Sequence, residues 1–216
     1  GLAWLIGAVG FNVDDYRTNT QVAGRISPRL IDLMAALATG TVGAFALVRR
    51  DISDAQLQQV YDTMKWAPTS MNCQPARFVF LRSAEAKARL KSALSPNNLA
   101  KTLAAPVVVI VAMDTRFYEH LPTLFPAYDA KPMFEANAAL AEATAFRNSS
   151  LQGAYFIIAA RLHGLDCGPM SGFDAGKLNA EFFADGRFKA NFLINLGHGD
   201  AAGNHPRGPR LGFAEA

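Results

Sequence analysis

The pattern of apolar positions first becomes regular just after residue 51, where it predicts a helix. Apolar side chains recur there at the three- and four-residue spacing of one helical face, at Leu57, Val60, Tyr61 and Met64. Ser53 and Gln56 have the spacing of a capping box, which satisfies the free backbone amides at the start of a helix. Pro68 ends the pattern, because a proline disfavours helical backbone at the preceding residue.

Further along the chain, the pattern predicts alternating strands and helices. The predicted elements are a strand at 77–82, a helix from Ser83 to about Leu94, a strand at 107–112, one long helix over Glu135–His163 ended by Gly164, a glycine and proline loop at 164–173, a short helix from Asp174 to about Ala184, and a strand at 188–196. The valine-rich run at 107–112 is typical of a strand buried on both faces. Residues 151–162 are apolar on almost every side, which is typical of a helix in a large core or a dimer interface. This order predicts a sheet with helices packed on it.

Composition narrows the class of protein. The 216 residues are 50% hydrophobic and 18% charged, which excludes a disordered chain and favours one domain with some apolar surface covered by a partner subunit. The 21 Lys and Arg nearly balance the 18 Asp and Glu, so the net charge of +3 indicates neither a nucleic-acid nor a membrane partner. The apolar run at 1–10 is too short to span a membrane and has no positive flank. The chain has two cysteines, which are not spaced as metal ligands. They suit a reducing compartment, and a cytoplasmic location is expected.

Several well-known motifs are absent or incomplete. The run Gly197–Gly203 follows a predicted strand, but its glycine spacing is one residue too long for a dinucleotide-binding loop, and a plain turn is favoured. Ser171 is misplaced for a nucleophile elbow. The four histidines show no metal-ligand pair. We therefore expect no metal and no catalytic nucleophile from the protein.

Two loops are richer in polar and special-geometry residues than a simple connection needs. Residues 68–75 place hydroxyl and amide side chains between two prolines, which suits either hydrogen bonding to a ligand or a self-satisfied capped loop. Residues 166–174 contain glycines that would let a flat ligand approach the backbone, with Met170 as a soft apolar surface, or they form a tight turn. Arg207 and Arg210 suit a phosphate, although solvated charges are the commoner meaning of such residues. From the residues alone, both readings of each segment stay open.

Together these segments resemble the nitroreductase superfamily, and in particular its branch that looks like the malonic semialdehyde reductase of pyrimidine degradation. The resemblance runs from about Ser53 to the C-terminus and rests on four blocks in order. These blocks are Met64–Cys73, Glu142–Ser150, Gly168–Asp174 and Pro206–Leu211.

The resemblance implies an α+β fold with a central mixed β-sheet flanked by helices, in an intertwined homodimer with one FMN in each of two clefts. The residues it assigns to the cofactor are Ser70, Asn72, Asn148, Gly168, Pro169, Met170, Arg207 and Arg210. Ser70 and Asn72 would contact the flavin from one subunit, and the backbone at 168–170 would lie along the ring. Arg207 or Arg210 would meet the phosphate, and Asn148 would reach the cleft from the long helix.

The activity implied by the resemblance is transfer of hydride from NAD(P)H through FMN to a small acceptor, with ping-pong kinetics. The acceptor would be a small semialdehyde such as malonic semialdehyde, or a nitroaromatic or quinone. A flavin-binding or degenerate member without turnover is the alternative, and a purely structural dimerisation protein ranks last because it leaves the two polar loops unexplained.

The N-terminal segment departs from the resemblance. Residues 1–50 match the family poorly, so the nitroreductase-like domain is placed at 51–216. Relatives usually carry an arginine-containing, phosphate-binding segment where this chain reads 38–45, and no cation stands there. Either nearby arginines of the segment 25–50 substitute, or the segment was altered by a reading-frame change. If the segment is genuine, weakened FMN affinity is the expected consequence.

Overall fold

The centre of the fold is a sheet built around one long strand, β5 (Phe188–Gly199). The computed structural model describes residues 47–48, 50–199 and 208–216. One edge of β5 pairs with β3 (Val107–Asp114) and the other with β4 (Asp166–Met170), and the last residues of β5 pair with β1 (Leu47–Val48). On its far side β3 pairs with β2 (Ala76–Leu81). All of these described pairings are antiparallel, which differs from the expected mixed sheet: β3 and β4 run in the same direction, but β5 lies between them.

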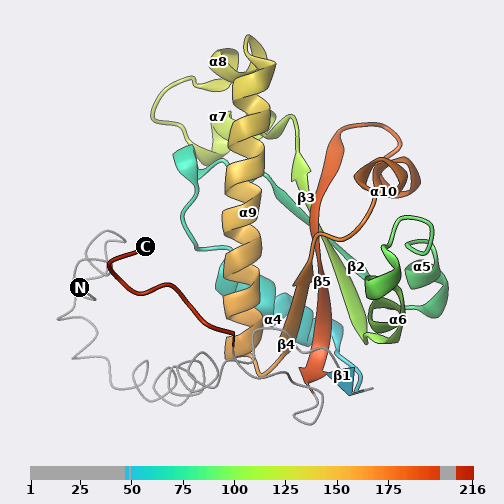
Figure 1. Ribbon diagram of the computed structural model, residues 1–216. Coiled ribbons are helices and arrows are strands. Elements are labelled where there is room, and N and C mark those ends of the chain that lie inside the picture. The colour runs from blue at the N-terminus through green and yellow to red at the C-terminus, as the bar shows by residue number, and fades with distance from the viewer. Residues whose placement is uncertain (1–46, 49, 200–207) are drawn as a thin grey trace. The chain divides into compact units, whose positions relative to one another are not determined.

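One face of the sheet is covered by α4 (Asp54–Met64) and the long helix α9 (Ala138–Leu162), as Figure 1 shows. Their inner residues pack on one side of the strands because alternate residues of a strand point to the same face. The buried residues of this layer are Ile52, Leu57, Val60, Met64, Val107, Val109, Val111, Phe156, Ala159, Ala160, Leu165, Cys167, Ile194 and Leu196.

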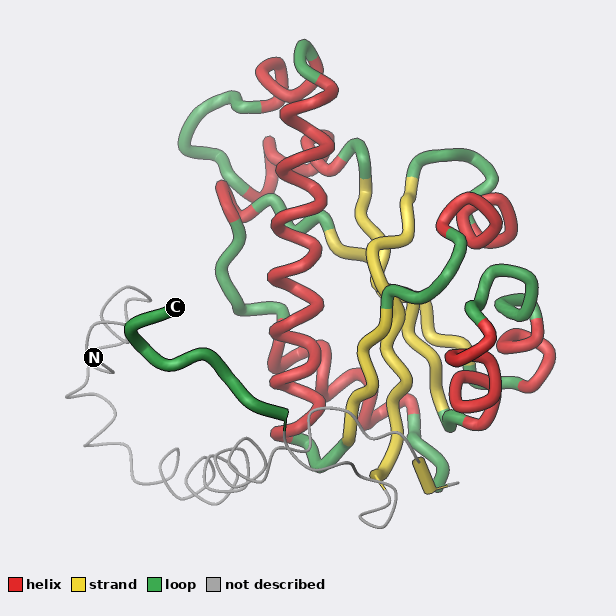
Figure 2. Tube along the Cα trace, in the orientation of Figure 1, coloured by secondary structure: helices red, strands yellow, loops and turns green. Residues whose placement is uncertain are grey.

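The opposite face is covered by three short helices, α5 (Ala84–Ala88), α6 (Pro96–Ala104) and α10 (Ala175–Phe182). Figure 2 shows the strand layer between the two groups of helices. The buried residues on this side are Leu81, Leu90, Ala93, Leu94, Ala105, Val108, Ile110, Ala112, Leu178, Phe183 and Leu193.

A third, smaller core lies around the N-terminal half of α9. It gathers the short helices η1 (Ser70–Asn72), η2 (Phe117–His120), α7 (Leu121–Leu124) and α8 (Lys131–Glu135). Its buried residues are Cys73, Met113, Phe117, Leu121, Ala130, Phe134, Ala141 and Ala145. The loop at 69–75 is therefore fixed by the same core that holds the segment between β3 and α9.

Much of the predicted element pattern is confirmed. The capping box at the start of α4 is present, with Ser53 and Gln56 bonded reciprocally. The strand at 107–112 is fully buried and extends to Asp114. Gly164 ends α9 with a φ of 75°, the left-handed backbone for which glycine is suited. The sequence also indicates a helix around Arg29–Leu37, which lies outside the described residues.

Four local predictions were wrong. Residues 166–170 form strand β4 rather than part of a loop, because pairing with β5 overrides the poor strand propensity of Gly168 and Pro169. The predicted helix from Ser83 to Leu94 ends at Ala88, and α6 at 96–104 was not predicted. The long helix begins at residue 138 instead of 135, because the Asn137 side chain accepts the backbone N–H of Leu140 and caps it.

The close approach of α9 to the sheet depends on Gly153. A Cβ atom at this position would lie 2.3 Å from Cζ of Phe192 on β5. We expect Gly153→Ala to lower the free energy of unfolding by about 1 kcal/mol, because overpacking costs about 1–3 kcal/mol and alanine returns about 1 kcal/mol of helix propensity. Thermal unfolding should show a midpoint lower by about 3 °C.

The matched control is Gly176→Ala on α10, where an added Cβ meets only Oδ1 of Asp174, at 3.3 Å. This variant should unfold close to the wild-type midpoint. A Gly153→Ala protein as stable as the control would show that the contact with Phe192 does not constrain the helix.

Candidate functional site

The loop at 69–75 has an unusual backbone. Met71, Asn72 and Gln74 have φ values of 51°, 48° and 39°, in the left-handed region that residues other than glycine rarely adopt. Each such residue costs roughly 1–2 kcal/mol, and such strain persists only where the surroundings enforce it. The loop is therefore the first place to look for a functional site.

Two buried amide side chains on α9 hold the two ends of this loop. Oδ1 of Asn148 accepts the backbone N–H of Ser70 at 2.8 Å, and Oε1 of Gln152 accepts the backbone N–H of Ala76 at 2.8 Å. The two amides lie one helical turn apart, on the face that α9 turns toward the loop. Asn148 also donates to the carbonyl of Thr144, so both ends of its amide are engaged inside the protein. In this chain Asn148 positions the loop.

The middle of the loop is fixed by its own polar side chains. Asn72 donates to the carbonyl of Leu124 at 2.9 Å, and its oxygen accepts from Nε2 of Gln74 at 2.8 Å. The hydroxyl of Thr69 accepts the backbone N–H of Gln74. Ser70 is solvent-exposed.

Cys73 takes no part in that surface. Its thiol lies in the third core, where burial raises its pKa to about 11. Cys167 on β4 is buried as well, and burial raises its pKa to about 12. Both side chains are therefore protonated near neutral pH and act as small apolar groups rather than as nucleophiles.

The predicted residues Gly168, Pro169 and Met170 form most of β4. Among the described residues β4 pairs only with β5 and with no strand along its other edge, so backbone groups of that edge face outward. The sulfur of Met170 accepts from the hydroxyl of Thr102 on α6 at 3.4 Å. The backbone edge of β4 is thus the part that a flat ligand can approach.

The turn after β4 is anchored to α6. The carbonyl of Gly172 accepts from Nδ2 of Asn98 and from the backbone N–H of Ser95, each at 3.0 Å. A Cβ atom at residue 172 would lie 2.4 Å from Nδ2 of Asn98, so any larger residue there would displace the Asn98 side chain. This anchoring fixes the direction in which the chain leaves β4.

The structure brings some of the predicted residues together and separates others. Ser70, Asn72 and Asn148 lie in one hydrogen-bonded region, and Gly168–Met170 lie on β4 at the sheet edge. No hydrogen bond within the described residues joins these two groups. Arg210 is exposed and donates to the nearby carbonyls of Gly208 and Pro209. Arg207 lies outside the described residues.

The outward face of α9 is apolar, and several of its large side chains are exposed among the described residues. Phe146, Leu151 and Ile158 are 53%, 41% and 42% exposed. A groove of about 610 Å³ lies over this face, lined by Ala143, Phe146, Arg147, Ser150, Leu151 and Ala154. Apolar patches of this kind mark surfaces that a partner covers.

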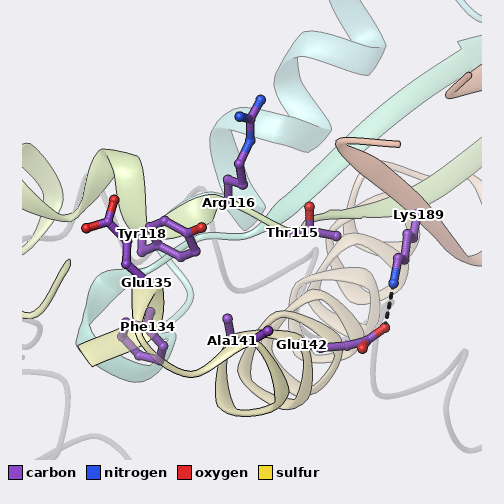
Figure 3. A pocket seen from close by; sticks show the side chains of 9 residues that line it. Thr115, Arg116, Tyr118, Phe134, Glu135, Ala141, Glu142 and Lys189 are labelled. Atoms are coloured by element: carbon purple, nitrogen blue, oxygen red, sulfur yellow. Dashed lines mark hydrogen bonds and ion pairs between the residues drawn. The ribbon is translucent and has the colours of Figure 1, made fainter. Parts of the chain in front are cut away.

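A separate cavity of about 250 Å³ lies near the start of α9 (Figure 3). Its charged residues are mostly paired with neighbours, as in the contact of 2.7 Å between Nζ of Lys189 and Oε1 of Glu142. Its lining residues are Thr115, Arg116, Tyr118, Phe134, Glu135, Ala138, Ala141, Glu142 and Lys189. None of the predicted site residues lines this cavity, so it is not the candidate site.

Sequence reasoning missed three residues that shape the loop, namely Gln152, Arg77 and Asp114. Gln152 had a recognisable signal, since it is an amide four residues after Asn148 in an otherwise apolar stretch. Arg77 and Asp114 gave no local signal, because their contact depends on the pairing of β2 with β3.

Two family models match different parts of the chain, which overlap at residues 47–57. The model described as "Nitroreductase family" matches residues 47–198, and a model described as "Domain of unknown function (DUF389)" matches residues 1–57. No helix in the described part of the chain is long and apolar enough to cross a membrane.

Similar proteins agree with the first match. A Burkholderia lata protein named provisionally as an NADH dehydrogenase/NAD(P)H nitroreductase is 62% identical over 164 residues, which cover 76% of this chain and 84% of that protein. A Ralstonia pickettii protein with the same kind of name, HadB, is 56% identical over 170 residues, 77% of this chain and 87% of that protein.

Solved structures support the fold. A provisionally named nitroreductase from Bacillus subtilis aligns with a TM-score of 0.74 at 21% identity, covering 84% of this chain and 96% of that chain. A provisionally named nitroreductase from Exiguobacterium sibiricum, solved in complex with FMN, aligns with a TM-score of 0.72 at 22% identity, covering 84% and 94%. On the family match over residues 47–198 and the 62% and 56% identity of the Burkholderia lata and Ralstonia pickettii proteins, the chain belongs to the nitroreductase family.

Proposed function

We propose that this protein is an FMN-dependent NAD(P)H oxidoreductase that reduces a small semialdehyde, a nitroaromatic or a quinone. The observation that carries the proposal is the loop at 69–75, whose left-handed backbone is enforced by buried amides of α9. Such strain is retained where a fixed backbone shape serves binding. Membership of the nitroreductase family and the names of the relatives support the same activity.

The described residues fit the ring of an FMN. A flavin ring needs a flat approach and hydrogen-bonding groups along its edge, and β4 offers an open backbone edge and no side chain at Gly168. The exposed residue Ser70, and the loop at 69–75 that Asn148 holds, add a second set of polar groups. Arg207 and Arg210 are the proposed phosphate ligands.

These residues indicate which part of the reaction belongs to the cofactor and which to the protein. When bound, FMN supplies the hydride transfer between NAD(P)H and the acceptor. The protein holds the ring between the loop and β4, and the neutral, buried thiols of Cys73 and Cys167 stay out of the chemistry. Because Asn148 and Gln152 fix the loop before the cofactor arrives, binding costs little ordering of the chain.

A second copy of the chain is the proposed occupant of the outward face of α9. The loop at 69–75 and the edge of β4 form separate groups within one protomer, and a homodimer would let the loop of one subunit meet β4 of the other. The exposed side chains of Phe146, Leu151 and Ile158 would be buried by this contact. This is the arrangement that the family resemblance implies.

A semialdehyde is our first choice of acceptor because the four sequence blocks resemble the malonic semialdehyde reductase branch. The names of the relatives point instead to nitro compounds. Both classes are small and accept hydride, so the pocket formed between two subunits would decide between them.

A flavin-binding protein without turnover is the second candidate. It is favoured by the match of residues 1–57 to a model other than the nitroreductase model, in the part of the chain where relatives carry phosphate-binding arginines. Fewer cations near the phosphate would weaken binding, since charge-assisted contacts are the strong ones at such sites.

The proposed function predicts that the protein retains FMN and turns over. Purified protein that is mixed with FMN and desalted should keep the flavin absorption bands and oxidise NADH or NADPH when a semialdehyde, a nitroaromatic or a quinone is added. Double-reciprocal plots at several acceptor concentrations should give parallel lines. Flavin retention without turnover would favour the second candidate, and a colourless protein that gives no flavin fluorescence change on titration would reject the proposed function.

The proposed dimer predicts that a charge in the α9 groove separates the subunits. Leu151→Glu should shift the protein from dimer to monomer in light scattering after gel filtration, because a buried, unpaired carboxylate costs several kcal/mol at an interface. Met133→Glu is the matched control, since Met133 on α8 is 42% exposed and does not line the α9 groove. A wild-type monomer, or a Leu151→Glu protein that remains dimeric, would contradict this assembly.

A further inference from the structure

A buried ionic cluster lies at the end of β3, next to the loop at 69–75. Its centre is Asp114, whose side chain is fully buried. Oδ2 of Asp114 accepts from Arg77 at 2.8 Å and from Arg187 at 3.2 Å, and Oδ1 accepts from Nε of Arg187 at 3.2 Å. Oδ1 also accepts the backbone N–H of Arg116, and Nε2 of His120 lies 3.8 Å from Oδ2. The carboxylate is thus held from several elements at once.

The two arginines of the cluster differ in what else they contact. Arg187 reaches from the start of β5 and also pairs with Glu119 at 3.0 Å. Arg77 instead donates from Nη1 to the carbonyl of Gln74 at 3.0 Å and to the carbonyl of Ala76 at 2.9 Å. Among the described side chains, Arg77 therefore connects the buried carboxylate to the loop, beside the bond of 2.8 Å from the backbone N–H of Asp114 to the carbonyl of Pro75.

The contact with Gln74 falls on a strained residue. Gln74 has a φ of 39°, and its carbonyl would turn away if the residue relaxed to an ordinary backbone conformation. A guanidinium can hold this carbonyl and the carboxylate together because it presents five donors in one rigid plane. A lysine ammonium has no such fork, so it can serve one partner well but not both.

We infer that Arg77 is a positioning residue for the loop at 69–75 and is itself anchored by Asp114. It keeps this loop in its binding conformation before the cofactor arrives. The inference rests on the proposed function for the identity of the ligand. The apparent affinity for FMN then depends on the fraction of molecules whose loop is already in the binding conformation. This is because the observed Kd equals the intrinsic Kd divided by that fraction.

The test compares Arg77→Met and Arg77→Lys with Arg187→Met, which removes a cation from the same carboxylate but touches no loop carbonyl. FMN affinity is measured by quenching of flavin fluorescence. Hydrogen exchange of the cofactor-free protein is followed by mass spectrometry over peptides that contain residues 69–76. Thermal unfolding is measured in parallel for each variant.

Arg77→Met should raise the Kd for FMN about ten-fold and speed exchange of the loop amides, and Arg77→Lys should fall between Arg77→Met and the wild type. Arg187→Met should lower the unfolding midpoint while leaving the Kd and the loop exchange near wild type. Equal effects of Arg77→Met and Arg187→Met would reduce Arg77 to a structural role, and wild-type exchange in Arg77→Met would overturn the inference. If Arg77→Met fails to fold, Arg77→Lys, which retains the charge, decides the comparison.

The exchange experiment also separates the two proposals. A wild-type protein that binds no FMN would reject the proposed function. Loop exchange in the cofactor-free variants would still show whether Arg77 orders the loop, since that measurement needs no ligand.

Discussion

The architecture of the candidate site depends on the hydrogen bonds between α9 and the loop at 69–75. Asn148 and Gln152 lie one turn apart on α9. Asn148 accepts the backbone N–H of Ser70 in the loop, and Gln152 accepts the backbone N–H of Ala76, where β2 begins. A buried backbone amide without a partner costs about 1–3 kcal/mol, so the buried bond to Ala76 favours the observed path at the end of the loop, and the bond to Ser70 fixes its start. The left-handed residues between the two anchors follow from this constraint.

The same helix links the loop to the surface that we propose for dimer formation. The inner side of α9 packs on the sheet and holds the loop, and its outer side exposes Phe146, Leu151 and Ile158. A rigid helix transmits the position of one side to the other, because protein interiors are close-packed and deform little. Loop geometry and subunit contact are thus set by one element, which explains why this helix has polar residues at a few inner positions and apolar residues at many outer ones.

The sequence was informative where local chemistry decides the structure. The capping box of α4, the buried strand β3 and the glycine that ends α9 were all predicted, because each depends on neighbouring residues. Strand β4 was missed because Gly168 and Pro169 form a strand only through pairing with β5. Helix α6 was missed because its buried residues include Asn98 and Thr102, polar side chains that serve the turn after β4.

For the site, the sequence located the two loops but not the way they are held. Ser70 and Asn148 were both selected, yet Asn148 was expected to contact a ligand, and the structure shows its amide engaged with the protein backbone at both ends. Arg77 and Asp114 could not be paired in advance, since they are 37 positions apart and meet only through the register that places Ala76 opposite Met113.

We propose that the N-terminal segment affects cofactor affinity through electrostatics. The nitroreductase match begins at residue 47, and the sheet and both layers of helices are assembled from residues after that point. The fold therefore does not need the arginine-containing segment of the relatives, whereas an FMN phosphate gains from every cation within reach. A chain of this kind can keep the ring-binding loop and β4 intact and still bind the whole cofactor more weakly, so the ring and the phosphate contribute separately to the function of this protein.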